Sequence, residues 1–373
     1  MPSGKKIAIV YDWIDKWGGV ERVLLTLHDM FPKADFYTSY FDSQKAAWAR
    51  SFRIRTSFVD RLPAAMKNSR LLSLPFYPFA FETLDLSAYD LIISVTSSFA
   101  KSVITKPGSR HICYLLTPTR FLWVTPNLYL NKLQQLVLSP FINHLKKWDK
   151  VVAYRPDKII SISQTVANRC RQYYQRESKV VYPPFDMDYW NGIKSNIKTQ
   201  KSKLQIKNQK FFLIVSRLEP YKKVDLVLQL FKKLKRLLVI VGTGTQEEKL
   251  KKIAEKNVLF LKGLTDEEMG WLYSRAEALI MPQEEDFGYV ALEAQFFGCP
   301  VIAYGKGGAR ETITEGKTGL FFGEQTNTSL LKILARFHTI SYNLKDSTQT
   351  IGIENSEKFS KIKFINHFLN EIK

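Results

Sequence analysis

Cysteine is scarce in this sequence. Its 373 residues include three cysteines, Cys113, Cys170 and Cys299, which are widely spaced and lie among apolar neighbours. Three isolated cysteines exclude a disulfide framework and a cysteine-based zinc site, and they are typical of a protein in a reducing cytosol. The 5 histidines are scattered singly and form no metal-ligand spacing either.

Long apolar runs are also missing. No stretch has the uninterrupted apolar length that a membrane-spanning helix needs. The start, MPSGKKIAIVYDW, leads directly into a strand-like segment and lacks the apolar core of a signal peptide. We therefore expect a cytoplasmic protein, with a peripheral contact to the inner face of the plasma membrane as a further expectation.

Acidic residues are outnumbered, with 35 Asp and Glu against 55 Lys and Arg and a net charge of +20. This surplus favours an anionic partner, which can be a phosphate compound, a membrane surface or a nucleic acid. Part of the charge is clustered, in residues 144–158 and 193–210. A nucleic-acid-binding protein is a rival interpretation on charge alone, but no recognisable helix-turn-helix, zinc or RNA-binding signature supports it. We expect no nucleic-acid partner.

Short apolar runs alternate with amphipathic stretches along the chain. KIAIVYDW is strand-like and GGVERVLLTLHDMF is helix-like, and the same rhythm restarts at FFLIVSRL and VDLVLQLFKKL. This alternation predicts an α/β protein with parallel sheets and crossover helices. The tandem prolines of VVYPPFDMDYWN can continue neither a helix nor a central strand, so they mark a domain junction. We expect Rossmann-like domains over 1–184 and 185–355, with an amphipathic helix at about 356–373 that packs back on the first.

An acidic loop, EEDFGYVALE, follows the strand-like segment EALIMP. In a parallel sheet, ligands bind beyond the carboxyl ends of the strands, where this loop lies. The backbone N–H groups of Phe287 to Val290 lie where a helix begins and can bind hydroxyls or anions. Glu285 precedes this helix and Glu293 lies about one turn into it, so both carboxylates suit sugar hydroxyls at two depths of one pocket. The alternative is that Glu285 caps the helix and Glu293 lies on its solvated face.

A basic loop, SRLEPYKKVD, follows the strand-like segment FFLIV. Arg217 and Lys222 then supply a forked donor and a point charge, which together suit a diphosphate. The alternative is an ordinary basic loop on a basic protein. Asp186 and Asp188 have the Asp-x-Asp spacing that some sugar transferases use for a metal, but at a Pro-rich junction they indicate a turn. We therefore expect no metal and no other cofactor, since the basic pair supplies the positive charge.

Glycine turns follow other strand-like segments. Gly18 and Gly19 open the first predicted helix and can bring backbone amides close to a phosphate. Gly242 and Gly244 follow LLVIV, but the third glycine of a dinucleotide fingerprint is missing. A dehydrogenase is therefore disfavoured.

Taken in order, these motifs resemble the retaining glycosyltransferases of family 4. EDFGYVALE is similar to the family's Glu-x7-Glu signature, and SRLEPYKKVD to its phosphate clamp. VGTGTQEEKL, FLKGLTDEEM, CPVIAYGKGGARETI and GKTGLFF are similar to its other landmarks. HICYLLTPTRFLW and VVYPPFD resemble its bacterial mannosyltransferase-like branch. The resemblance implies the GT-B fold, in which two Rossmann-like domains with parallel sheets face an interdomain cleft.

The resemblance also implies roles for single residues. Arg217 and Lys222 would hold the donor diphosphate, and Glu285 would hold hydroxyls of the donor sugar. These three are the expected catalytic residues. Glu293 would bind the nucleotide ribose. The donor-binding residues implied in this way are Gly18, Gly19, Lys223, Gly242, Gly244, Lys262, Leu264, Phe287, Gly288, Tyr289 and Glu293.

One position departs from the family's pattern. Many relatives carry a His before the Thr-Pro of the segment that reads YLLTPTR here, and this chain has Leu116 in that place. A His can donate to the sugar or stabilise charge in the transition state, whereas a Leu can only pack. Glu21, Thr117 and Arg120 are expected on the acceptor side, with a structural ion pair as the alternative for Arg120. Leu116 keeps a second interpretation open, a nucleotide-sugar-binding protein without transferase activity.

The expected reaction moves a hexosyl group from a nucleotide sugar to a glycan or lipid-linked glycan in surface polysaccharide synthesis, with retention. The first choice of donor is GDP-mannose, and UDP- and dTDP-sugars are the others. No carboxylate is well placed by sequence to act as a covalent nucleophile. This favours a front-side displacement, in which the leaving diphosphate accepts the acceptor's proton.

Overall fold

The chain folds into two compact units. The first, the N-terminal unit, contains Met1–Pro184 with Ile362–Lys373, and the second, the C-terminal unit, is Phe185–Lys361. Each has a parallel sheet, so the predicted α/β class with two Rossmann-like domains is confirmed. This is a computed structural model, and the residues that it describes are 4–67, 69–126, 132–199, 206 and 209–373. The basic stretch at 193–210 lies partly outside them.

The N-terminal unit is built around a sheet with the strand order β3-β2-β1-β4-β5-β6-β7. In the described part of this unit the strands are β1 (Ile7–Tyr11), β2 (Asp35–Thr38), β3 (Arg53–Thr56), β4 (Leu91–Thr96), β5 (Arg110–Leu115), β6 (Lys158–Ser161) and β7 (Lys179–Val180). The α-helices are α1 (Val20–Met30), α2 (Ala64–Lys67), α3 (Arg70–Ser73), α4 (Tyr77–Glu82), α5 (Arg120–Trp123), α6 (Lys132–Val152), α7 (Gln164–Arg169) and α15 (Lys361–Ile372). Shorter turns are η1 (Ala47–Ala49), η2 (Phe58–Arg61), η3 (Leu74–Phe76), η4 (Ala100–Ser102) and the π-helical η6 (Cys170–Tyr174).

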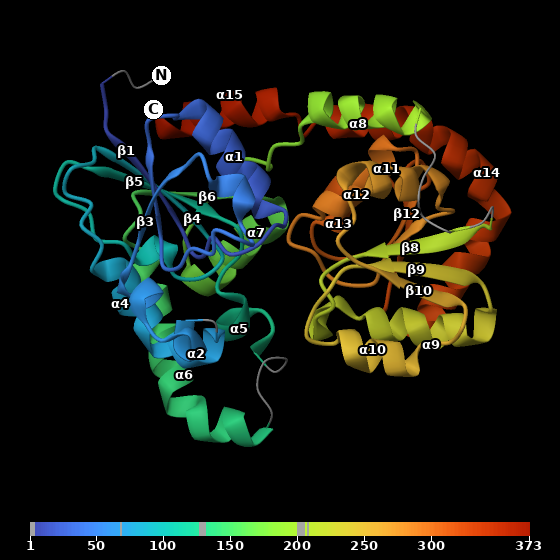
Figure 1. Cartoon of the computed structure of the whole chain (residues 1–373), viewed down its shortest axis with the longest axis horizontal. Coiled ribbons are helices and arrows are strands. Elements are labelled where there is room, and N and C mark those ends of the chain that lie inside the picture. Colours follow the sequence, from blue (N-terminus) through green and yellow to red (C-terminus); the bar gives the residue numbers. More distant parts are fainter. Residues whose placement is uncertain (1–3, 68, 127–131, 200–205, 207–208) are drawn as a thin grey trace. The chain divides into compact units, whose positions relative to one another are not determined.

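The C-terminal unit repeats this plan with the strand order β10-β9-β8-β11-β12-β13. Where the structure describes this unit, its strands are β8 (Phe211–Val215), β9 (Leu237–Val241), β10 (Val258–Leu261), β11 (Leu279–Met281), β12 (Val301–Tyr304) and β13 (Gly319–Phe322). Its helices are α8 (Met187–Thr199), α9 (Val224–Leu234), α10 (Glu247–Ile253), α11 (Asp266–Arg275), α12 (Tyr289–Phe296), α13 (Ala309–Thr312) and α14 (Asn327–Glu357), with a 3-10 turn η7 (Pro220–Lys222). Figure 1 shows α9 and α10 on one side of β8, β9 and β10, with α11 and α12 on the other.

The paired strands of the described residues run parallel, which requires a crossover connection between one strand and the next. The strand β4 is buried along its whole length, as the continuous apolar run DLIISVT predicts for a strand covered on both faces. In the C-terminal unit, α9 packs Val227 and Phe231 into a core with Leu238 and Ile240 of β9. This packing holds the carboxyl ends of the strands at one edge, where the loops that follow them gather.

Local signals in the sequence set several helix starts. The predicted cap of α11 is confirmed, because Thr265 accepts from Glu268 N and the Glu268 carboxylate accepts from Thr265 N in a complete capping box. The helix α1 begins after Gly19, as the glycine turn predicts. The Asp186 carboxylate accepts from Tyr189 N at 3.0 Å at the start of α8, which is the turn chemistry expected there.

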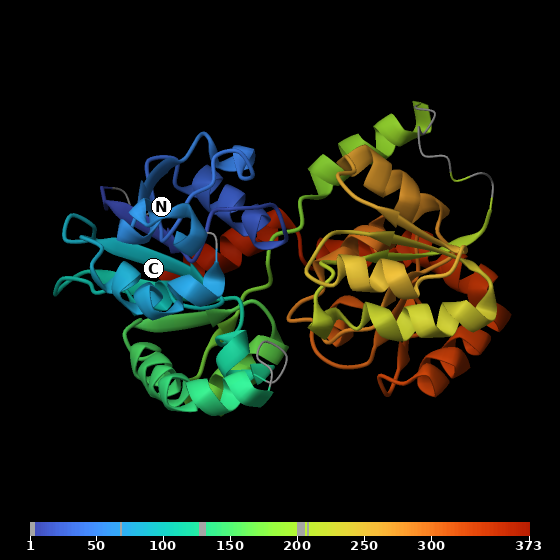
Figure 2. The same cartoon turned by 60° about the horizontal axis from the view of Figure 1, so that its bottom comes forward.

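The C-terminal helix starts later than the sequence predicts. The expected helix at 356–373 is replaced by the end of α14 at Glu357, a break, and α15. The break occurs because Ser360 leaves the helix to form a parallel β-bridge with Phe185. Phe364 and Phe368 of α15 pack edge-on against Tyr114 of β5, both at 5.8 Å between ring centroids. Figure 2 shows α15 in red beside the N-terminal sheet.

The three cysteines are buried and carry no disulfide. Burial raises the pKa of the Cys113 and Cys299 thiols to about 12, so both remain protonated and unreactive at neutral pH. Among the helices of the described residues, none combines the length and the apolar character needed to cross a bilayer.

Candidate functional site

The C-terminal sheet has a topological switch point between β8 and β11. These strands are neighbours, while β9 and β10 continue the sheet on one side and β12 and β13 on the other. Connections that leave two adjacent strands in opposite directions open a crevice at their carboxyl ends, where ligands of such sheets bind. The basic loop at 216–223 follows β8 and the acidic loop at 282–288 follows β11. The predicted catalytic residues therefore lie at this switch point.

Lys222 and Glu285 meet across the crevice. Lys222 Nζ lies 2.6 Å from Glu285 Oε1, and both side chains are largely buried, with 11% and 18% exposed. Gln283 Nε2 donates to the same Oε1 at 2.6 Å. A partly buried cation at the end of one strand is thus paired with a partly buried carboxylate at the end of the next. The arrangement offers positive charge to a phosphate and acceptor oxygens to hydroxyls.

Arg217 and Lys223 belong to the same loop but make different contacts. Arg217 is exposed, and its Nη2 donates to Tyr221 OH at 2.8 Å. Lys223 is a non-glycine residue in the left-handed region, with φ of 53°, directly between η7 and α9. Such a backbone is strained in a lysine, and strain of this kind concentrates at functional sites. The loop therefore presents two cations besides Lys222.

The loops after β8 and β9 are tied together by close backbone contacts. Leu218 N donates to Thr243 O at 2.8 Å, and Gln246 N donates to Leu218 O at 2.8 Å. A Cβ on Gly242 would lie 1.9 Å from the carbonyl oxygen of Ser216, and Gly242 has φ of +143°. A Cβ on Gly244 would meet the backbone of Leu218 at 2.5 Å. Glycine is therefore required at both predicted positions by the packing of these loops.

The loops after β11 and β12 approach each other in the same way. Gly308 N donates to Glu285 O at 2.8 Å, and a Cβ on Gly308 would lie 2.4 Å from Phe287 Cα. Gly288 has φ of +94° and forms the N-cap of α12, so Tyr289 is the first residue of that helix. The first backbone N–H groups of an α-helix have no acceptor within the helix, so the start of α12 can donate to a ligand.

Glu293 does not lie on a solvated helix face. It is 8% exposed, and its Oε2 accepts from Tyr273 OH of α11 at 2.8 Å. A buried carboxylate that is positioned by a tyrosine is a suitable acceptor for a pair of ligand hydroxyls. The structure thus contradicts the alternative in which Glu293 is an ordinary surface residue.

Lys262 and Leu264 lie apart from these residues. They follow β10, the edge strand, which is two strands away from β8. The Lys262 ammonium is exposed and lies 4.0 Å from Glu247 Oε1 of α10. The structure therefore places both residues beyond the Gly242 loop and not beside Lys222.

The N-terminal unit has its own switch point, between β1 and β4. Gly18 and Gly19 are exposed in the loop after β1, and Glu21 is the second residue of α1. Glu21 is 2% exposed, and within the described residues its Oε2 has no hydrogen-bond partner. Burial, opposed by backbone hydrogen bonds and the Lys16 charge, raises the pKa of the Glu21 carboxyl to about 7. This carboxyl is therefore close to half protonated at neutral pH.

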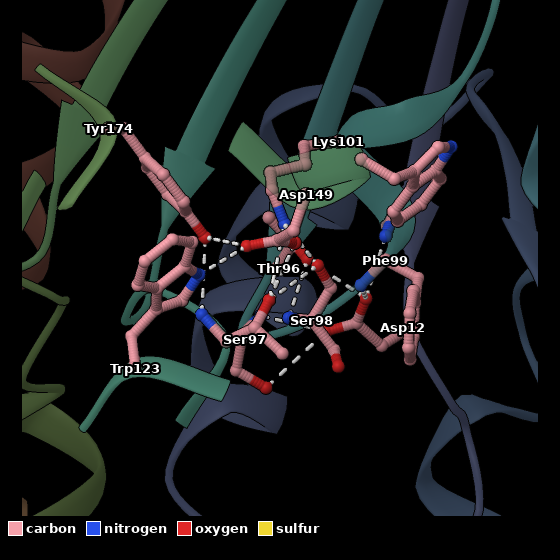
Figure 3. A network of polar contacts seen from close by, with 12 residues as sticks. Asp12, Thr96, Ser97, Ser98, Phe99, Lys101, Trp123, Asp149 and Tyr174 are labelled. Carbon is pink, nitrogen blue, oxygen red and sulfur yellow. Dashed lines mark hydrogen bonds and ion pairs between the residues drawn. The ribbon is translucent and has the colours of Figure 1, made fainter. Parts of the chain in front are cut away.

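Asp12 joins the two loops at this switch point. Its Oδ1 accepts from Phe99 N and Ala100 N, both at 2.8 Å, and from Thr96 Oγ1 at 2.9 Å. Its Oδ2 accepts from Ser97 N at 2.7 Å. Figure 3 shows the Asp12 carboxylate enclosed by this turn. The buried aspartate shapes the loop after β4, and it is not among the predicted site residues.

The segment after β5 carries the remaining predicted residues. Leu116 extends the strand, with its N donating to Thr96 O at 2.8 Å. Thr117 is 3% exposed, and among the residues that the structure describes its Oγ1 has no partner. Arg120 is half-buried and is the first residue of α5. Thr117 and Arg120 are therefore held on one short turn.

Several residues of these sites carry no distinctive signal in the sequence. Gln283 and Tyr273 are recognisable only from their contacts with Glu285 and Glu293. Asp12 directly follows a predicted strand, which is a position that could have been flagged.

Two parallel-sheet units with a lysine–glutamate pair beyond the strand ends are the arrangement of a glycosyltransferase of the GT-B fold. Solved structures agree with this fold. HepE of Anabaena in complex with UDP-glucose has a TM-score of 0.71 at 18% identity, with 98% of each chain covered. Sucrose-phosphate synthase of Thermosynechococcus elongatus has a TM-score of 0.75 at 16% identity, again with 98% of each chain covered.

The family follows from the sequence models. Residues 17–189 match the model "Glycosyltransferase Family 4", and residues 196–351 match "Glycosyl transferases group 1". The chain belongs to glycosyltransferase family 4, as its motifs predict.

Individual relatives are more distant. An uncharacterized 41.2 kDa protein in the cps region of Klebsiella pneumoniae is 27% identical over 246 residues, which cover 61% of this chain and 67% of that protein. The GDP-mannose-dependent alpha-(1-6)-phosphatidylinositol monomannoside mannosyltransferase of Mycolicibacterium smegmatis is 35% identical over 123 residues. That match covers only 28% of this chain and 32% of the mycobacterial relative.

Proposed function

We propose that this glycosyltransferase moves a mannosyl group from GDP-mannose to a glycan or lipid-linked glycan acceptor, with retention, in surface polysaccharide synthesis. The observation that carries the donor site is the contact between Lys222 and Glu285 at the switch point of the C-terminal sheet. The choice of mannose is supported by the mannosyltransferase named among the relatives, and that of a polysaccharide by the relative from a cps region. UDP- and dTDP-sugars are the alternative donors.

The donor is proposed to bind with its diphosphate toward the basic loop. Lys222 and Arg217 neutralise the two phosphates, with Lys223 as a further cation at the start of α9. Glu285 accepts hydrogen bonds from the sugar hydroxyls, and the first amides of α12 donate hydrogen bonds to the sugar. Glu293 binds the ribose hydroxyls. Two cations reproduce the charge that a divalent metal supplies in other transferases, so the proposed reaction needs no metal.

The proposed chemistry is a front-side displacement. The bond between the acceptor oxygen and the anomeric carbon forms on the face from which the diphosphate departs. The anomeric carbon–oxygen bond to phosphate breaks, and the leaving phosphate oxygen takes the acceptor's proton. Lys222 and Arg217 contribute by stabilising charge on the leaving group, which is electrostatic catalysis that requires no nucleophilic side chain.

The acceptor is proposed to bind to the N-terminal unit near Glu21, Thr117 and Arg120. The support for this is that Glu21 Oε2 and Thr117 Oγ1 are buried oxygens with no protein partner among the described residues. An oxygen of this kind costs free energy unless a ligand hydroxyl satisfies it.

A peripheral membrane contact is proposed for the surface formed by α3 and α4. Leu71, Leu72 and Phe79 are 51%, 53% and 59% exposed there. Lys67 ends α2 and Arg70 begins α3, where they pair with Asp60 and Asp15. Exposed apolar side chains with neighbouring cations are the composition of an interfacial surface on anionic lipid. Cosedimentation with vesicles containing phosphatidylglycerol tests this contact. The unaltered protein should sediment with the vesicles, and the triple variant Leu71→Ser, Leu72→Ser, Phe79→Ser should remain in the supernatant.

The donor assignment is tested by a thermal-shift screen against GDP-mannose, UDP-sugars and dTDP-sugars. At a hundredfold excess over Kd, the true donor should stabilise the folded state by about 3 kcal/mol. Replacement of Lys222 or Glu293 by Ala should then reduce transfer by on the order of a hundredfold or more. Circular dichroism should report an unchanged fold for both variants.

A matched control is Lys251→Ala. Lys251 forms an exposed i,i+4 ion pair with Glu247 in α10 of the same unit, so its loss changes the charge equally without touching the crevice. Full transfer activity in Lys222→Ala would refute the proposed mechanism. Donor binding without any turnover would instead favour the binding protein suggested by Leu116.

A further inference from the structure

A buried carboxylate in the N-terminal unit collects hydrogen bonds from three other segments. Asp149 of α6 is 0% exposed. Its Oδ1 accepts from Lys101 Nζ at 2.7 Å and from Thr119 Oγ1 at 2.9 Å. Its Oδ2 accepts from Trp123 Nε1 at 2.7 Å and from Tyr174 OH at 2.8 Å. Figure 3 shows Asp149 enclosed by Lys101, Trp123 and Tyr174.

This arrangement is a complete buried network. The side chain of Lys101 is 1% exposed, so the ion pair with Asp149 lies wholly out of water. Burial, together with the charge of Asp149, raises the pKa of Tyr174 well above its usual range, so the phenol keeps its proton and donates it. Buried charges are expensive, and a fully satisfied network serves to fix one geometry more than to add net stability.

The geometry that the network fixes is that of α5. Thr119 is the N-cap residue of α5 and Trp123 is its last residue, so Asp149 holds both ends of this one-turn helix. The indole of Trp123 also stacks on Tyr173 at 5.5 Å between ring centroids. Thr117 and Arg120, the two acceptor-side residues on this segment, lie two residues before the cap and directly after it.

We propose that Asp149 is a positioning residue, which holds the turn from Thr117 to Trp123 in the shape that binds the acceptor. This inference rests on the proposed function for the location of the acceptor. Asp149 is not a catalytic residue, because it is fully buried and acts through Thr119 and Trp123. The sugar-nucleotide crevice belongs to the other unit, so disturbance of the network should leave donor binding unchanged.

The test uses Thr119 because its hydroxyl can be removed without a change of shape. Thr119→Val deletes the bond to Asp149 and the longer contacts with Ser98 O and Lys101 Nζ, and it leaves the ion pair between Lys101 and Asp149 in place. Thr119→Ser keeps the hydroxyl as the matched control. Trp123→Phe removes the other anchoring donor and retains an aromatic ring. Amide hydrogen exchange of residues 117–124 is measured on the full chain. Transfer is measured with GDP-mannose and octyl α-D-mannoside as probes.

In Thr119→Val and Trp123→Phe, exchange at 117–124 should accelerate and the KM for the octyl mannoside should rise. Each change should be roughly tenfold, as expected for one lost hydrogen bond to a charged group. The KM for the donor and the nucleotide-induced shift in Tm should not move, and Thr119→Ser should behave as the unaltered protein. A merely structural role would lower Tm and reduce kcat without this separation of the two KM values.

The experiment distinguishes failure of the positioning role from failure of the proposed function. Unchanged exchange at 117–124 in Thr119→Val overturns the positioning role, whether or not the probe is a substrate. An equal rise in both KM values overturns it as well. Failure of the unaltered protein to bind any nucleotide sugar or to transfer to any acceptor contradicts the proposed function instead, and the exchange data still decide whether Asp149 anchors the turn.

Discussion

At the scale of single residues, Glu21 links the free energy of unfolding to pH. Burial raises the pKa of its carboxyl from 4.5 to about 7. The folded state therefore keeps a proton that the unfolded chain releases between these two values, so the free energy of unfolding falls as pH rises through this window. The contribution is fully present below the unfolded pKa and is lost once pH exceeds about 7.

Glu21→Gln should remove this dependence. A rise of this size in pKa corresponds to roughly 3 kcal/mol. Between pH 4.5 and pH 8, the free energy of unfolding of the unaltered protein should therefore fall by about 3 kcal/mol more than that of the variant. Urea denaturation at both pH values measures the four free energies of unfolding. Groups common to both proteins, such as His111 with its pKa lowered by burial to about 3, cancel in the double difference.

The matched comparison is Glu82→Gln, a carboxylate of the same unit that pairs with Arg155 at 2.7 Å. Its removal should not flatten the decline in stability above pH 5. An equal pH dependence in Glu21→Gln and in the unaltered protein would mean that the Glu21 carboxyl titrates as it does in water.

At the scale of elements, the loop glycines allow the loops after β8 and β9 to pack closely. The loop after β9 packs so closely on the loop after β8 that a Cβ at Gly242 would lie 1.9 Å from Ser216 O. Gly242→Ala must also adopt φ of +143°, which alanine tolerates poorly. We expect a loss of roughly 2 kcal/mol or more in stability, with displacement of the basic loop.

Gly323→Ala is the control for this variant. Nothing lies within 4 Å of a Cβ at Gly323, so the substitution adds a methyl group in open space in the same unit. Its Tm should stay near that of the unaltered protein, whereas Tm and nucleotide binding should both fall in Gly242→Ala. Equal Tm values for the two variants would contradict the close approach of the loops.

The sequence predicts elements better than it predicts contacts between them. Apolar runs and glycine turns locate β4, α1 and α11, because local patterning and capping decide these elements. The contact between Lys222 and Glu285 could be expected only as a shared edge of a sheet, since 63 positions separate them and packing of parallel strands brings them together. The break before α15 could not be predicted, because the bridge from Ser360 to Phe185 is a tertiary contact.

Buried polar networks were the least predictable feature. Asp149 lies in a helix whose sequence gives no reason to expect an inward aspartate, and its four donors come from distant segments. Glu293 was ambiguous for a related reason. Its helical position fits both a surface carboxylate and a buried one, and only the hydroxyl of Tyr273 on a neighbouring helix decides between them.

At the scale of the whole molecule, the two units share one strand arrangement and one kind of contact between loops. Each sheet reverses its order between its first and fourth strands, β1 and β4 in one unit and β8 and β11 in the other. In each unit a side chain after the first strand binds the loop after the fourth: Asp12 binds the turn at Ser97, and Lys222 binds Glu285. The first contact is closed by backbone amides, whereas the second joins two charged side chains.

The two units also differ in how their chains are completed. The C-terminal unit is one continuous segment, Phe185–Lys361, and its core cluster is drawn entirely from that segment. The N-terminal unit needs Ile362–Lys373, whose Phe364 and Phe368 are 2% and 0% exposed against the sheet. A domain with its own core can fold alone, whereas a domain that lacks one packed helix exposes an apolar face.

A fragment of residues 185–361 should therefore unfold in one cooperative transition. A fragment of residues 1–184 should be less stable than the same unit in the full chain, because loss of each buried phenylalanine costs about 3 kcal/mol or more. Addition of a peptide of residues 361–373 should restore part of this stability, and the gain should grow with the logarithm of the peptide concentration. Chemical denaturation followed by circular dichroism measures the stability of both fragments and of the 1–184 fragment with the peptide.

A peptide carrying Phe364→Ser and Phe368→Ser is the matched control and should have no effect. A non-cooperative 185–361 fragment, or a 1–184 fragment indifferent to the unaltered peptide, would contradict this division of the core.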